Sequence, residues 1–226
     1  MILMESEDVI ASIRQIYARF PITENLAMHM CRAASVGELV YDHLGKKEGS
    51  RNEITAALLL HDLGNIVKFK LDPEHAHLLG REQANIGRWK ELQAETINTY
   101  GTDDDHEVTY RMVGELGVSK RLEFITRNYW DIGSVEPSRD ISLTICAYGD
   151  CRTGPYGILS VRERFGDLLK RYRGDRREHG FQVAFANALN MEKYLIERTD
   201  LSPEDVNDNS IRPYLEHHLS ALGMAK

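Results

Sequence analysis

Apolar residues recur along the chain at intervals of three and four positions, the period of an amphipathic helix. The first helix closes at Pro21, and its apolar stripe is formed by Val9, Ile10, Ile13, Ile16 and Tyr17. Thr23 stands at a capping position, so a long helix is predicted over residues 24–44, with Gly45 behind it. The next helix, over residues 52–63, is apolar nearly all round, which predicts a central position.

The same period continues through the rest of the chain. Further helices are predicted over residues 80–100, 105–116, 119–128 and 141–150, and three more helical pieces are expected between residues 158 and 226. The run Gly154-Pro155-Tyr156-Gly157 is typical of a turn. The sequence holds no alternating pattern long enough for a sheet and no internal repeat. The predicted fold class is therefore all-α.

Charge and cysteine content exclude several classes of protein. The chain of 226 residues carries 28 basic and 35 acidic side chains, a formal charge of -7, which argues against an extended nucleic-acid surface but allows a nucleotide as ligand. Three cysteines are too few for a disulfide framework. The N-terminus does not resemble a signal peptide, and the longest apolar run, residues 56–60, is far short of the roughly 20 residues of a membrane helix. These features predict a cytoplasmic protein without a membrane anchor.

The dipeptide His61-Asp62 directly follows the most apolar helix. Ionisable side chains at the end of a buried helix cost free energy unless they are paired or bound to a metal. His29 lies on or beside the apolar face of the preceding helix, where it is either a metal ligand or a core histidine bonded to a carbonyl. Asp150 ends a largely apolar helix, where its charge opposes the helix dipole. Either a cation or a pair with Arg152 would compensate it.

A known family shows these residues in this order. His29, then His61-Asp62 followed by Leu63-Gly64, then Asp150, resembles the H…HD…D pattern of the HD superfamily of metal-dependent phosphohydrolases. The stretch 155–165 also looks like the segment that follows the last aspartate in some bacterial and archaeal members. The resemblance covers residues 23–172. It implies an HD-type helical bundle over these residues. Outside the resemblance, we expect residues 1–22 to form an N-terminal helix packed on the bundle. We expect residues 173–226 to form a helical extension of the same globule, either as an extra helical layer or as a homodimer contact.

The resemblance also implies a metal and a reaction. His29, His61, Asp62 and Asp150 would hold one divalent transition metal, for which manganese, iron, cobalt, nickel and zinc are the candidates. The metal would activate water to cleave a phosphate ester of a nucleotide or a related phosphorylated metabolite. Asn65 occupies a position where nucleotidase-like branches often carry glutamate, so the general base stays open.

Other polar residues near the pattern are candidates for the chemistry. Asp62, Lys68 and Arg32 are the catalytic candidates, with a solvated lysine as the alternative for Lys68. Lys68, Arg152 and Arg164 are the candidates for binding substrate phosphate, with structural ion pairs as the alternative for the arginines. His217 and His218 are expected at the surface.

Two further functions compete with phosphate hydrolysis. Some HD proteins are di-iron oxygenases, and here His106, with His75 or His77, would complete a second iron site. His75 and His77 would otherwise close over a one-metal site. The later histidine of two-metal members falls near Asn128, which favours one metal, with His106 as the candidate for an additional ligand. The remaining alternative is a non-catalytic metal- or nucleotide-binding module.

Overall fold

The fold is built from helices alone. The computed structural model describes residues 3–72, 74–171 and 178–224, and this part of the chain forms eleven α-helices, three 3-10 helices and no strand. The all-α prediction is confirmed. In chain order the elements are α1 (Ser6–Ala11), α2 (Ile13–Arg19), α3 (Glu24–Asp42), α4 (Arg51–Leu60), η1 (Asn65–Lys68), η2 (Ala76–Asn85), α5 (Ile86–Tyr100), α6 (Asp105–Leu116), α7 (Lys120–Asn128), α8 (Ile141–Arg152), α9 (Val161–Arg171), α10 (Glu178–Ile196), η3 (Pro203–Asp205) and α11 (Arg212–Leu222).

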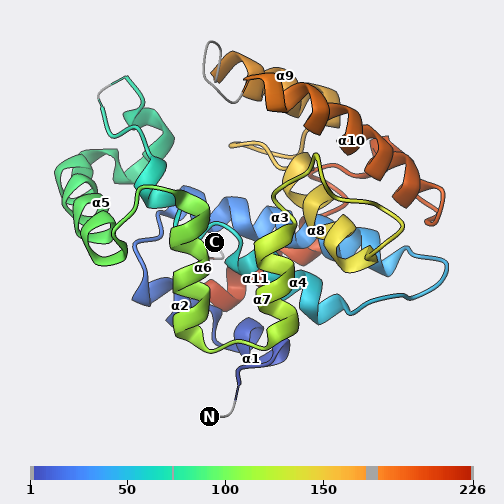
Figure 1. Ribbon diagram of the computed structural model, residues 1–226, viewed down its shortest axis with the longest axis horizontal. Coiled ribbons are helices and arrows are strands. Elements are labelled where there is room, and N and C mark those ends of the chain that lie inside the picture. Colours follow the sequence, from blue (N-terminus) through green and yellow to red (C-terminus); the bar gives the residue numbers. More distant parts are fainter. Residues whose placement is uncertain (1–2, 73, 172–177, 225–226) are drawn as a thin grey trace.

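Helices α3, α4 and α8 pack against one another at the centre of the molecule (Figure 1). The predicted cap of α3 is present, because the Thr23 side chain accepts a hydrogen bond from the Leu26 N–H at 3.1 Å. Two glycines permit the close approach of the three helices. A Cβ atom on Gly37 would lie 2.7 Å from Leu58, and one on Gly149 would lie 3.0 Å from the carbonyl oxygen of Ala33. This close packing brings the functional ends of the helices together.

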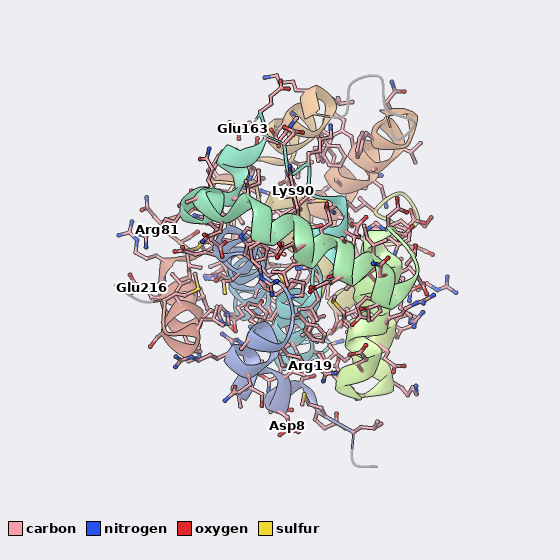
Figure 2. All side chains as sticks on the ribbon, turned by 90° about the vertical axis from the view of Figure 1, so that its left-hand side faces the viewer. Asp8, Arg19, Arg81, Lys90, Glu163 and Glu216 are labelled. Atoms are coloured by element: carbon pink, nitrogen blue, oxygen red, sulfur yellow. The ribbon has the colours of Figure 1, made fainter. Side chains whose placement is uncertain are left out.

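The other helices surround this centre. Helix α10 packs on α8 and α9, and α11 packs on α2 and α3, while α5 and the α9–α10 pair project on different sides of the molecule (Figure 1). The charged side chains labelled in Figure 2, among them Lys90 of α5, are exposed on the outside of the helical body. No helix in the described part of the chain combines the length and the apolar character needed to cross a membrane.

Several helix boundaries differ from the prediction. The predicted N-terminal helix is two helices, because Ser12 leaves the helical conformation with φ -102° and ψ 8°. The stretch around Gly80 forms 3-10 turns before α5 begins, since Gly80 has a positive φ of 60° that a regular helix does not allow. Helix α8 continues to Arg152. The predicted domain boundary between residues 172 and 173 lies outside the described residues.

The prediction that His218 lies at the surface is wrong, because it is only 2% exposed. Its Nε2 lies 2.9 Å from Oε2 of Glu38, which is itself buried on α3. The other oxygen of Glu38 accepts hydrogen bonds from Arg51 at 2.9 Å and from Thr55 at 3.0 Å. We call these four residues the Glu38 cluster. It ties α11 to α3 and α4 through a carboxylate whose two oxygens both have partners.

Candidate metal centre

Four of the predicted ligands meet where three helices come together. His29 lies in the second turn of α3, and Asp150 lies in the last turn of α8. Helix α4 ends at Leu60, so His61 and Asp62 stand in the turn that follows it. The His61 side chain is fully buried, whereas the other three side chains are 14–24% exposed. The site is therefore a partly open group of polar side chains at the end of the apolar core.

The distances within this group are short and similar. His29 Nε2 lies 3.2 Å from His61 Nε2. Asp150 Oδ1 lies 3.3 Å from His29 Nε2 and 3.6 Å from His61 Nε2, and Asp62 Oδ2 lies 3.5 Å from each imidazole nitrogen. Neighbouring ligand atoms about 2.1 Å from one transition-metal ion are separated by roughly 3.0–3.5 Å. The ligand atoms of His29, His61 and Asp150, which all lie within 4.8 Å of one another, therefore have a spacing that fits a common ion, and Asp62 lies 3.5 Å from both imidazoles of this group.

The hydrogen bond of His61 to the backbone indicates which of its ring nitrogens faces the other ligands. His61 Nδ1 lies 2.6 Å from the carbonyl oxygen of Leu58, which can only accept, so Nδ1 carries the proton. In the neutral imidazole, Nε2 then presents a lone pair to His29 and to the two carboxylates. This nitrogen carries a lone pair and the two carboxylates carry negative charge, so the group needs positive charge, either from a proton on an imidazole or from a cation between the ligand atoms. Two imidazoles and two carboxylates suit a divalent transition metal.

The charges of the group shift its pKa values accordingly. Burial alone lowers the pKa of His61, but the facing carboxylates of Asp62 and Asp150 outweigh it and raise this pKa to about 9. Burial acts to raise the pKa of Asp150, yet His29 and His61 bring it well below the usual range. Without a metal, therefore, a proton on the imidazoles supplies the positive charge, and a metal ion would have to displace it.

Tyr129 supports the buried histidine. Its hydroxyl donates to the carbonyl oxygen of His61 at 3.3 Å, and its ring packs edge-on against the imidazole at 5.7 Å between centroids. Burial raises the pKa of the Tyr129 phenol well above its usual value, so the residue stays neutral. It fixes the orientation of His61 without adding charge to the group.

A cleft of about 410 Å³ opens over the group, a size that suits a small-molecule ligand. His29, Asp62 and Asp150 line it, and His61 lies behind them. Several basic side chains line the same cleft, namely Lys68, Lys70, His75, His106 and Arg164. The cleft also has an apolar and aromatic part formed by Leu26, Phe69, Leu71, Leu79, Tyr129, Trp130, Tyr156 and Leu168. This arrangement places acidic metal ligands and basic groups around one space.

Two of the predicted substrate ligands lie in this cleft. Lys68 reaches it from η1 and forms an ion pair with Asp105 at 2.6 Å. Arg164 reaches it from α9, with Nη1 3.5 Å from Asp167. The Nε of Arg164 is buried and has no hydrogen-bond partner among the described residues. Arg164 therefore contributes a charged side chain to the lining of the cleft.

The structure corrects the expectation that Arg152 binds substrate. Arg152 is 3% exposed, and its guanidinium donates to Tyr148, to Glu192 at 3.1 Å and to three carbonyl oxygens, those of Leu159, Pro203 and Val206. It does not compensate Asp150 either, because the imidazoles of His29 and His61 do so. Arg152 instead joins α8 to α10 and to the segment around η3.

The expectation that Arg32 is catalytic is corrected as well. Arg32 does not line the cleft, and its Nε is buried without a hydrogen-bond partner in the described part of the chain. Burial lowers its pKa, and the attraction of Asp208 acts in the opposite direction. Asp208 in turn accepts from the backbone N–H of Ile158 at 3.2 Å. Arg32 therefore lies within the electrostatic influence of Asp208 and does not line the cleft.

The additional histidines have different environments. His106 lines the cleft, stacks on Trp130 at 4.2 Å between ring centroids, and lies 3.9 Å from Asp105. His75 lines the cleft and pairs with Asp72 at 2.7 Å. The side chain of His77 lies outside what the structure describes. The sequence analysis did not single out Asp72 or Asp105, although the spacing Asp72-x-x-His75 is a signal for a local pair.

Three comparisons with known proteins returned nothing: no protein-family model, no curated protein and no solved structure matches this chain significantly.

Proposed function

We propose that this protein is a metal-dependent phosphohydrolase of the HD type. The observation that carries the proposal is the meeting of His29, His61, Asp62 and Asp150, two imidazoles and two carboxylates whose facing atoms lie 3.2–3.6 Å apart. Their order in the sequence is the order of the HD pattern. The basic residues around the same cleft give an anionic substrate a place beside that cation.

Each residue has a role in this proposal. When bound, the metal supplies an activated water and polarises the phosphoryl group. Arg164 and Lys68 hold phosphoryl oxygens through charge-assisted hydrogen bonds. Asp62 directs Oδ2 toward both imidazoles, so its second oxygen is the group that accepts the proton of the attacking water. This assignment gives Asp62 the role of the glutamate that Asn65 replaces.

The substrate in this proposal is a small phosphorylated molecule, a nucleotide or a related metabolite, which a cleft of about 410 Å³ accommodates in large part. The setting is the cytoplasm, since Cys31, Cys146 and Cys151 are all buried free thiols. No extended nucleic-acid surface belongs to this function, and a homodimer is compatible with it.

A di-iron oxygenase is the second candidate, and one observation favours it. Asp104, Asp105 and His106 place three ligand atoms within 4.8 Å of one another, and His106 lines the same cleft. Two features weigh against a second metal there. Asp105 is already paired with Lys68, and the ring of His106 stacks on Trp130. Two irons per chain and oxygen-dependent turnover would favour this candidate.

Phosphate release tests the proposal. Purified protein, reconstituted in separate samples with Mn²⁺, Fe²⁺, Co²⁺, Ni²⁺ and Zn²⁺, is assayed with phosphomonoesters, phosphodiesters and nucleoside triphosphates. We expect hydrolysis in one of these classes, lost on chelation and restored by the metal. A protein that holds the metal but hydrolyses none of the substrates would contradict the proposal and favour the binding module.

A further inference from the structure

A histidine–aspartate pair stands at the edge of the cleft, apart from the metal ligands. Oδ1 of Asp72 lies 2.7 Å from Nδ1 of His75 and also accepts the backbone N–H of His75 at 2.9 Å. Both hydrogen bonds are local and span three residues. The Asp72 carboxylate therefore holds the backbone and the imidazole ring of His75 at the same time. The orientation of the imidazole is therefore fixed by its own loop.

The pair leaves one ring nitrogen of His75 for another partner. Because a carboxylate accepts, Nδ1 carries a proton, and Nε2 is the atom that can exchange a proton with a ligand. None of the described residues forms a hydrogen bond with Nε2. The His75 side chain lines the cleft together with Asp62 and Asp150, and it is one-third exposed. His75 therefore faces the same space as the candidate metal ligands Asp62 and Asp150.

The other basic groups of the cleft are less suited to proton transfer. Lys68 is held by Asp105, and Arg164 forms an ion pair with Asp167. His106 lies 3.9 Å from Asp105, and its ring stacks on Trp130. Asp72 is held as a carboxylate, because the hydrogen bonds from the side chain and backbone of His75 lower the pKa of Asp72. His75 thus combines an orienting carboxylate with a nitrogen available to substrate.

We infer that His75, oriented by Asp72, is the general acid that protonates the leaving group of the phosphate ester. This inference rests on the proposed function. As the bond from water oxygen to phosphorus forms and the ester P–O bond breaks, the leaving oxygen keeps the electron pair and takes the proton from Nε2. Asp62 accepts the proton of the attacking water. The neutral imidazole then regains a proton from solvent and Asp62 releases its proton to solvent, so the protein is unchanged and the net reaction consumes one water and releases alcohol and phosphate.

The dependence on the leaving group distinguishes this role from a structural one. A nitrophenolate leaves without protonation, whereas an alkoxide needs a general acid. We compare His75→Asn with the wild type on p-nitrophenyl phosphate and on ethyl phosphate. We expect kcat/KM to fall about 100-fold or more on ethyl phosphate and to change by no more than about threefold on p-nitrophenyl phosphate. Asp72→Asn, which removes the orienting carboxylate, is expected to show the same preference with a smaller loss.

His43 offers a matched control. It forms the same kind of pair, with Nδ1 2.6 Å from Oδ1 of Asp200, but does not line the metal cleft. His43→Asn is expected to leave both activities unchanged. Metal content is measured in every variant, because Asp72, Glu74 and His75 also place three ligand atoms within 4.8 Å of one another. We expect His75→Asn to keep the metal content of the wild type.

The outcomes separate this inference from the proposed function. An equal loss on both substrates, no loss on either, or a loss of bound metal in His75→Asn would overturn the role of His75 while the wild type remains an active phosphohydrolase. A wild type that hydrolyses only phosphodiesters or nucleoside triphosphates would overturn the role of His75 in the cleavage of phosphomonoesters. If the wild type hydrolyses none of the three substrate classes, the proposed function fails, and the role of His75 fails with it.

Discussion

Two groups of histidine and carboxylate side chains each include one residue of α3, and they differ in how their polar atoms are satisfied. In the Glu38 cluster, one carboxylate meets three donors, from Arg51, Thr55 and His218, so its charge is compensated within the protein. In the metal centre, two carboxylates and two imidazole nitrogens face one another, and the proton of His61 is turned away toward Leu58.

The difference shows that residue type alone does not define a metal site. Histidine and acidic side chains within hydrogen-bonding distance occur in both groups, but only one group is short of positive charge. That group also lines a cleft, whereas Glu38 and His218 are buried. We therefore assign a structural role to the Glu38 cluster and a ligand-binding role to the metal centre.

Replacement of His61 gives the largest expected effect on activity. His61→Gln removes a nitrogen ligand, so metal-dependent hydrolysis is expected to fall about 1,000-fold or more. The measurement is kcat/KM under saturating metal, with circular dichroism as the check on folding. A variant that keeps more than a tenth of the wild-type activity would contradict the role of His61 as a ligand.

Replacement of His218 tests the structural role of the Glu38 cluster. His218→Ala leaves a buried carboxylate oxygen of Glu38 without its partner, which is expected to lower the free energy of unfolding by about 3 kcal/mol. Urea unfolding measures this loss. Metal content and the activity of the folded variant are expected to stay at the wild-type level. A loss of metal would show that the two groups are not separate in function.

The pH dependence of the free energy of unfolding tests whether the four-residue group needs positive charge from a proton or a metal. His61 has an ordinary pKa of 6.5 and a pKa of about 9 in the folded, metal-free protein, so its protonated form stabilises the fold. This stabilisation, up to about 3 kcal/mol, is fully present below pH 6.5 and is lost as the pH rises to about 9. Chelated protein should therefore melt at a falling temperature over this range. The melting temperature of the metal-loaded protein should not fall over this range. The same dependence of melting temperature on pH in both forms would contradict a cation-binding role for the group.

Replacement of Arg164 gives the smallest predicted effect on activity, and replacement of the buried Arg152 serves as its control. Arg164→Ala removes a donor from the cleft and is expected to lower kcat/KM by roughly tenfold, with little change in melting temperature. Arg152→Ala should lower the melting temperature instead, because Arg152 joins three segments from the interior. Steady-state kinetics and thermal unfolding of both variants check this, and a reversed pattern would contradict the assignment of Arg164.

The helices could be predicted from the sequence because they depend on local pattern, whereas the four central residues are predicted from their resemblance to the HD pattern. The apolar period sets the helices, and His61-Asp62 stands out because it follows a helix with no polar face. The buried positions of Arg152 and His218 could not be predicted, because each depends on a partner 40 or more positions away in the sequence. These partners are Glu192 for Arg152 and Glu38 for His218. Likewise, the break at Ser12 has no glycine or proline to mark it.

Metal content per chain tests the central claim most directly. Elemental analysis is made on protein purified without chelator, for the wild type, Asp62→Ala and the control His218→Ala. The account predicts about one transition-metal ion per chain in the wild type and in His218→Ala, and its loss in Asp62→Ala. A wild-type protein that binds no metal, even after reconstitution, would contradict it and would make His61 and Asp62 structural residues.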